Sequence, residues 1–174
     1  MIIGQFERAS DTGRMAYLIL CLEEYLTVKM PERDWTPVLE VLWSFTRFES
    51  WDDWSAAAAD IIPSCFFDAQ GPQDFEYLSK EQCDKIAVLY QDIPEAWEEL
   101  LGAVQHAAPL YANGTRDCRE YADEDANLVA QIMQKEGVPL PSEDVASLSP
   151  AHPRAEHDKP IDAALLSRVL DYQP

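Results

Sequence analysis

The chain has 174 residues, and its 32 Asp and Glu against 13 Lys and Arg give a formal net charge of −19. A charge of this size opposes contact with a nucleic-acid backbone or an anionic membrane surface, so neither is expected as a partner. The length suits a single domain with its own core. No apolar run approaches the ~20 residues of a membrane span and no secretory leader pattern is present, which predicts a cytoplasmic protein.

The cysteines form no metal or disulfide motif. They are scattered along a sequence that has no CxxC or HxxxH pair. Small thiols buried in helices, in a reducing compartment, explain this distribution better than a disulfide framework does. We therefore expect no metal and no cofactor. The four residues are Cys21, Cys65, Cys83 and Cys118.

The first predicted helix begins at Gly13, after residues 1–12, which include Ser10 and are either a strap or a frayed end. From Met15 to Leu22 every residue is apolar, and the pattern continues to Leu26 on one face only. A helix that is apolar on all sides belongs in the middle of a bundle.

Residues 34–68 contain four of the five tryptophans, whose large rings require a core. Thr36 and Pro37 predict an N-cap and a first helical residue, and apolar residues follow at helical spacing. Ser50 with Asp53 predicts a second helix start. We expect that helix to end near Pro63, because proline cannot continue the hydrogen-bond ladder. The four tryptophans are Trp35, Trp43, Trp51 and Trp54.

Residues 64–74 read as a connection that Phe66 and Phe67 anchor on the core. Ser79 and Gln82 have the capping-box spacing, which predicts a helix over the next apolar stripe. Pro94 is placed as the first residue of a further helix, whose stripe ends at Ala108, just before Pro109.

The last predicted helix of the body is long. Thr115 caps it after an Asn-Gly turn, and Gly137 closes it in a left-handed conformation. Its predicted core face is Cys118, Tyr121, Ala122, Leu128, Val129, Ile132 and Met133.

Prolines then punctuate the sequence, which predicts an extended strap over residues 138–160 and a short docking element over residues 161–171. The fold predicted from these elements is all-α: one domain of 174 residues, with a helical body over residues 13–137. We expect a single compact bundle of about five to seven helices with a proline-rich C-terminal strap.

No stretch of the sequence identifies an active site. Carboxylate pairs are abundant, but a sequence with this many acidic residues contains such pairs by chance. Adjacent acids on a helix also point about 100° apart and so do not face each other. His106 is explained by contact with a helix C-terminal dipole, and His152 and His157 lie in the polar tail. There is no phosphate loop, nucleophile elbow or zinc-protease signature, so we expect no catalytic residues.

Acidic residues on three predicted helices are the remaining functional signal. If they merge into one negative surface with Trp51, Tyr77 or Tyr111 at its rim, they combine steering charge with aromatic anchors, as interfaces do. The alternative is three separately solvated faces that serve only solubility. The candidate partner-binding residues are Asp52, Asp53, Asp60, Glu95, Glu98, Glu99, Glu120, Asp123 and Glu124, with Asp117 beside the last three.

Four stretches resemble small acidic bacterial proteins associated with polymorphic-toxin immunity loci. They are CLEEYLTVKMPERDWTPVLEVLWSFT (residues 21–46), DFEYLSKEQCDKIAVLYQ (residues 74–91), EGVPLP (residues 136–141) and IDAALLSRVL (residues 161–170). The resemblance covers under half of the chain and lies in core and turn segments, so it speaks for a shared fold more than for a shared activity. It implies a non-enzymatic protein that binds and neutralises a cognate toxin, and it assigns no binding residue.

Two classes of function follow. The first is an immunity-type inhibitor that uses an acidic helical face against a basic toxin domain. The second is an acidic interaction or scaffold module whose charge serves solubility, and an enzyme ranks third.

Overall fold

The computed structural model describes residues 6, 9–47, 50–142, 166–167 and 169–170, and these form seven α-helices and no β-strand. The predicted all-α class is confirmed for this part of the chain. The helices are α2 (Asp11–Lys29), α3 (Thr36–Trp43), α4 (Trp51–Ala59), α5 (Pro63–Asp68), α6 (Lys80–Leu89), α7 (Glu95–Asn113) and α8 (Arg116–Lys135), with short 3-10 turns η1 (Ser44–Thr46) and η2 (Pro72–Asp74).

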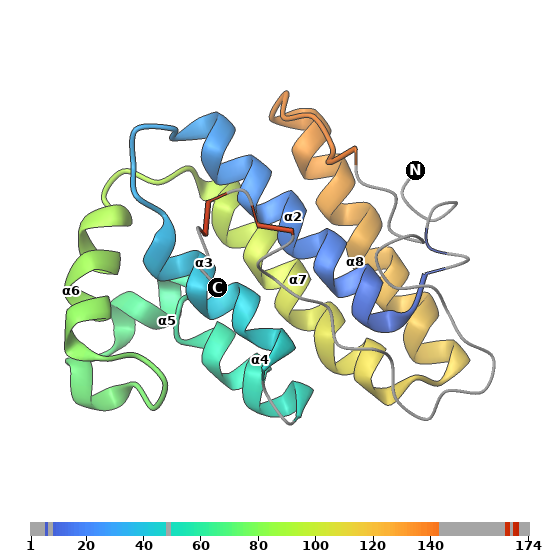
Figure 1. Ribbon diagram of the computed structural model, residues 1–174, viewed down its shortest axis with the longest axis horizontal. Coiled ribbons are helices and arrows are strands. Elements are labelled where there is room, and N and C mark those ends of the chain that lie inside the picture. Colours follow the sequence, from blue (N-terminus) through green and yellow to red (C-terminus); the bar gives the residue numbers. More distant parts are fainter. Residues whose placement is uncertain (1–5, 7–8, 48–49, 143–165, 168, 171–174) are drawn as a thin grey trace.

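Helix α7 lies at the centre of the packing. It contacts α8, α2 and α4, while α2 also contacts α8 and α3, and α3 contacts α4 and α6. The long helices α2, α7 and α8 lie side by side, with α3 and α4 along one side and α5 and α6 at one end (Figure 1). The seven helices therefore pack into one compact body.

Helix α2 is buried on all sides through its middle, since every residue from Met15 to Leu22 is buried. It begins at Asp11, two residues before its predicted start, because Ser10 caps it. The Gly13 amide donates to Ser10 Oγ at 3.0 Å. Despite this apolar middle, no helix in the described part of the chain is long and apolar enough to cross a membrane.

Helix α3 begins one residue earlier than predicted. Thr36 is its first residue and not its N-cap, which is Trp35. The Thr36 amide donates to Asp34 Oδ1 at 3.1 Å, and the hydrogen bonds from Thr36 lower the pKa of the Asp34 carboxyl. Asp34 thus satisfies an amide of the first turn.

Helix α4 starts at the predicted cap but ends sooner. The Asp53 amide donates to Ser50 Oγ at 3.1 Å, and α4 stops at Ala59. Pro63 does not end this helix but begins α5, because proline fits the first turn, where its missing amide has no helical partner. The predicted connection over residues 64–74 is therefore wrong for most of α5. Phe66 is buried there, as predicted, whereas Phe67 is 57% exposed.

Helices α6 and α7 show one correct start and one unexpected continuation. Ser79 and Gln82 form the predicted capping box of α6. Pro94 is the N-cap of α7, which begins at Glu95. Pro109 lies inside α7 on its exposed side, and the helix continues to Asn113. The helix end predicted before Pro109 is wrong.

Helix α8 has the predicted ends but a different buried face. Thr115 accepts from the Cys118 amide at 3.4 Å, and Gly137, at φ 69°, follows the C-cap. The Val138 amide donates to the Met133 carbonyl at 2.9 Å, which completes a Schellman closure. Tyr121 and Leu128 are 59% and 45% exposed, so their predicted place in the core is wrong, and Cys118 is half-buried. The core face is narrower and is made of Ala122, Ala126, Val129, Ile132 and Met133.

Four of the five tryptophans lie in the core, whereas Trp51, which the sequence also led us to expect there, is half-buried. Trp35, Trp43, Trp54 and Trp97 are at most 1% exposed. Trp35 and Trp97 lie 6.3 Å apart between ring centroids, and this pair joins α3 to the central helix α7.

The predicted strap (residues 138–160) and docking element (residues 161–171) lie mostly outside the described residues. In the part that is described, Leu170 is buried and Ser167 Oγ donates to Glu23 Oε2 at 2.8 Å. Glu23 also accepts from Trp43 Nε1 at 2.9 Å. This buried carboxylate of α2 therefore contacts both α3 and a residue near the C-terminus.

Candidate functional site

The acidic residues of α4 and α7 lie in or next to the first turns of their helices. Asp52, Asp53, Glu95 and Glu99 are exposed and Glu98 is half-buried. The two helices are in contact, and neither contains Lys or Arg. Gln105 Nε2 donates to the Ser55 carbonyl at 3.3 Å, so Asp52 and Asp53 lie beside the second half of α7, whereas the three glutamates lie at its start. We call the five residues together the α4–α7 acidic surface.

Three of the other predicted binding residues are engaged within the protein. Asp60 is half-buried and accepts from the Tyr77 amide at 3.3 Å, and burial raises the pKa of its carboxyl. Glu120 accepts from Arg116 Nε at 2.9 Å on the same helix. Asp123 belongs to a network described next, whereas Glu124 is exposed.

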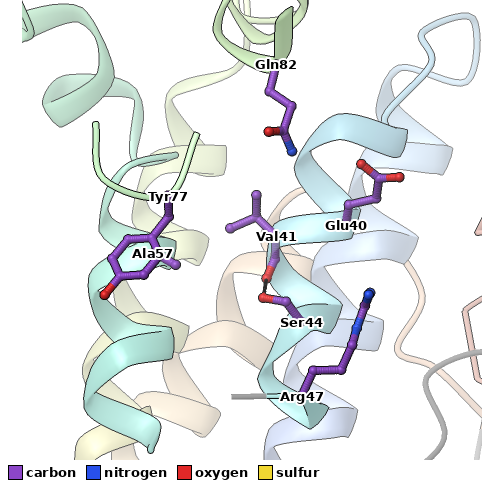
Figure 2. A pocket seen from close by; sticks show the side chains of 7 residues that line it. All are labelled: Glu40, Val41, Ser44, Arg47, Ala57, Tyr77 and Gln82. Carbon is purple, nitrogen blue, oxygen red and sulfur yellow. Dashed lines mark hydrogen bonds between the residues drawn. The ribbon is translucent and has the colours of Figure 1, made fainter. Parts of the chain in front are cut away.

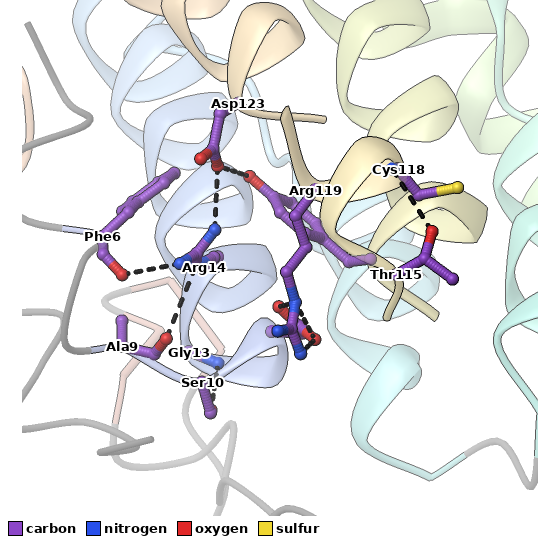
Figure 3. Close-up of polar contacts among 11 residues, drawn as sticks. Phe6, Ala9, Ser10, Gly13, Arg14, Thr115, Cys118, Arg119 and Asp123 are labelled. Carbon is purple, nitrogen blue, oxygen red and sulfur yellow. Dashed lines mark hydrogen bonds and ion pairs between the residues drawn. The ribbon is translucent and has the colours of Figure 1, made fainter. Parts of the chain in front are cut away.

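Arg14 organises a polar network between α2, α8 and the N-terminal residues (Figure 3). It donates to Asp123 Oδ1 at 3.0 Å and to the Phe6 carbonyl at 2.8 Å. The Tyr111 hydroxyl also donates to Asp123 Oδ1, at 3.0 Å. The side chains of Arg14 and Asp123 are only 12% and 19% exposed, so Asp123 serves the fold.

The cations of the described residues are mostly held in ion pairs. Seven Lys and Arg side chains each lie within 3.5 Å of a carboxylate oxygen. Most of the positive charge is thus already paired, and the excess carboxylates lie elsewhere on the surface. The paired cations are Arg14, Lys29, Arg33, Lys80, Lys85, Arg116 and Arg119.

The predicted rim aromatics behave differently from one another. Trp51 is half-buried against Phe45, at 6.1 Å between ring centroids, and Tyr77 is also half-buried. Tyr111 is 1% exposed, so its prediction as a rim residue is wrong. Because α7 continues through Pro109, Tyr111 turns inward, and burial raises the pKa of its hydroxyl.

A groove of about 500 Å³ lies between α3, α4 and the segment that leads into α6. Ala57 and Tyr77 form one side, and Val41, Glu40 and Arg47 form the other (Figure 2). Sequence reasoning missed this groove, because its walls come from three segments that no local pattern relates.

Cysteine and histidine residues form no further site in the described part of the chain. Cys21 and Cys83 are buried, as predicted, while Cys65 is exposed. Among these residues no group of three His, Cys, Asp or Glu side chains is placed to hold a metal ion. His106 lies about two turns before the end of α7, so the predicted dipole contact is wrong, and its Nδ1 lies 2.7 Å from Asp125 Oδ2. His152 and His157 fall outside the described residues.

Comparisons with protein-family models, curated proteins and solved structures find no match to this chain. The resemblance to immunity-locus proteins therefore stays a prediction.

Proposed function

We propose that this protein is a non-enzymatic binding protein of the immunity type, which neutralises a basic toxin domain through its α4–α7 acidic surface. One observation carries the proposal. Five carboxylates share two packed helices that contain no Lys or Arg, while seven cations elsewhere are already held in ion pairs.

This distribution favours a basic protein over other partners. Exposed carboxylates without a counter-charge attract a positive surface over roughly 8 Å at physiological salt, which raises the association rate and repels acidic proteins. Half-buried Trp51, at the start of α4, adds apolar area at the edge of the surface. Binding would inhibit the toxin by covering its active site or by holding it in an inactive form.

The resemblance to immunity-locus proteins supports the proposal from a separate direction. Its two longest stretches, residues 21–46 and 74–91, contribute buried residues of α2, α3 and α6 and not the acidic surface. They support a fold shared with those proteins. The binding surface would then differ from one protein to the next, to suit each toxin.

The test mixes the purified protein with the product of a toxin-like gene beside its own. Binding in the nanomolar range, with loss of toxin activity at equimolar ratio, is the expected result. A folded toxin domain that does not associate overturns the proposal. Association that leaves toxin activity unchanged also overturns inhibition and favours a scaffold module.

A further inference from the structure

The groove between α3, α4 and residues 75–82 has an apolar floor. Val41 and Ala57 are 7% and 2% exposed, and the half-buried ring of Tyr77 stands beside Ala57 (Figure 2). A volume of about 500 Å³ falls within the range of small-ligand pockets, roughly 300–1,000 Å³. The groove therefore has room for a long side chain of another protein.

One carboxylate lines the groove and two more lie near Tyr77. Glu40 lines the groove, Asp53 lies one turn before Ala57 on α4, and Glu76 precedes Tyr77. We call these three residues the rim carboxylates. All three are exposed, and none forms an ion pair among the described residues. Desolvation, followed by the negative charge of Glu76, Asp53 and Asp60, raises the pKa of the Tyr77 hydroxyl, as expected where these carboxylates lie close to it.

The position of Tyr77 is fixed by α4. Its amide donates to Asp60 Oδ2 at 3.3 Å, at the end of the helix that also supplies Asp53 and Ala57. These three α4 residues recur at four- and three-residue spacing, so they lie along one face of the helix and its following turn. Helix α4 therefore holds together the Tyr77 side of the groove, the Ala57 part of its floor and the rim carboxylate Asp53.

We propose that this groove receives one arginine or lysine side chain from the basic partner, and this inference rests on the proposed function for the identity of that partner. The methylene stem of such a side chain packs on Val41, Ala57 and the Tyr77 ring, while its charged head reaches the carboxylates of the rim. An apolar side chain would remove water from the rim carboxylates without giving them a positive charge to pair with, and an acidic side chain would be repelled.

Among the described residues that line the groove, Arg47 carries the one positive charge. It lies on the α3 side, across from Tyr77 (Figure 2). Its charge opposes a cationic occupant, so Arg47→Ala is predicted to strengthen binding, which is the opposite of the effect of removing a rim carboxylate. Two substitutions at the same groove therefore report on the sign of the charge that enters it.

The experiment titrates ¹⁵N-labelled full-length protein with acetyl-Gly-Arg-Gly-amide and follows the backbone amides by NMR. Shifts are expected to concentrate at Val41, Ala57, Tyr77 and Gln82. The same peptide with citrulline in place of arginine keeps the shape but not the charge and is expected to bind far more weakly. Glu40→Gln with Asp53→Asn should lower the affinity for the arginine peptide about fivefold, as expected for the loss of two exposed ion pairs.

A matched control separates the groove from general attraction to an acidic protein. Asp68→Asn with Asp92→Asn removes the same charge at two exposed positions outside both the groove and the α4–α7 acidic surface, and should leave the affinity of the groove for the arginine peptide within about twofold. Equal binding of the citrulline peptide, or shifts spread evenly over the acidic helices, would overturn the proposal. Since this titration contains no toxin domain, its failure removes the groove as an anchor, whereas toxin neutralisation stands or falls by its own assay.

Discussion

At the scale of single residues, local environment separates structural carboxylates from those available to a partner. Asp123 and Glu124 are neighbours on α8, yet Asp123 bonds Arg14 and Tyr111 whereas Glu124 is exposed and lies outside every ion pair of the described residues. The sequence offers both as equal candidates, because the Arg14 partner is 109 positions away. A run of acids in a sequence therefore overstates the size of a binding surface.

Asp123→Asn is predicted to lower the free energy of unfolding by about 1–3 kcal/mol, because Arg14 loses its counter-charge in a site where it is 12% exposed. Urea denaturation measures this change. Glu124→Gln, with the same change in charge one position along, should stay within about 0.5 kcal/mol of the parent protein. Equal losses in the two variants would show that Asp123 has no special structural role.

The partly buried carboxyl of Asp60 makes the stability of the protein depend on pH. Burial raises the pKa of its carboxyl in the folded protein, so between the ordinary pKa and the raised value the folded state binds more protons than the unfolded state. The stability contributed by this group therefore falls as the pH rises through that window. Asn carries no charge and keeps an oxygen that can accept from the Tyr77 amide.

We therefore expect Asp60→Asn to raise Tm at pH 7, with a gain that shrinks as the pH is lowered toward about 4. Thermal denaturation at several pH values measures this. A gain that does not depend on pH, or a loss at pH 7, argues against the raised pKa.

At the scale of helices, most caps were predictable, although Thr36 is not one, and the effects of Pro63 and Pro109 were not. Ser50, Ser79, Thr115 and Gly137 mark helix ends as expected, since each bonds or closes a terminus within four residues of itself. Pro109 looks like a terminator, but a proline on the exposed side of α7 costs one helical hydrogen bond, and tertiary packing of the turns around it keeps the helix intact. Local sequence does not contain that packing.

Two glycines in helical segments are predicted to respond oppositely to alanine. Gly102 lies inside α7, and a Cβ there meets nothing within 4 Å, so Gly102→Ala should stabilise the protein by about 0.5–1 kcal/mol. Gly137 has φ 69° in the closure of α8, so Gly137→Ala should destabilise it by about 1 kcal/mol. Chemical denaturation of both variants tests the pair, and effects of the same sign would contradict the assigned helix boundaries.

At the scale of the whole molecule, the all-α class followed from helical spacing of apolar residues and from tryptophans that require a core. The groove did not, because Val41, Ala57 and Tyr77 meet only after three segments have packed. The acidic surface stays a prediction: α4 and α7 pack together, whereas Asp60, Glu120 and Asp123 bond other groups of the protein.

The net charge of the whole molecule predicts how salt changes its thermal stability. With a formal charge of −19, the folded chain repels itself, while three of the ion pairs among the described residues are exposed on both sides and contribute little. Raising NaCl from about 0.1 M to about 1 M shortens the screening length from roughly 10 Å to 3 Å, so Tm should rise. Calorimetry measures this shift, and a fall in Tm would mean that the ion pairs outweigh the repulsion.

The most direct test of the central claim is the rate of association with the basic toxin partner, measured by stopped flow at increasing NaCl. Asp52→Lys with Asp53→Lys, and Glu95→Lys with Glu99→Lys, should each slow association about tenfold at low salt and flatten its salt dependence. Glu32→Lys with Asp68→Lys changes the net charge equally at exposed positions outside the α4–α7 acidic surface, and should change the rate by about twofold or less. Unchanged rates at low salt in both surface variants would contradict the account.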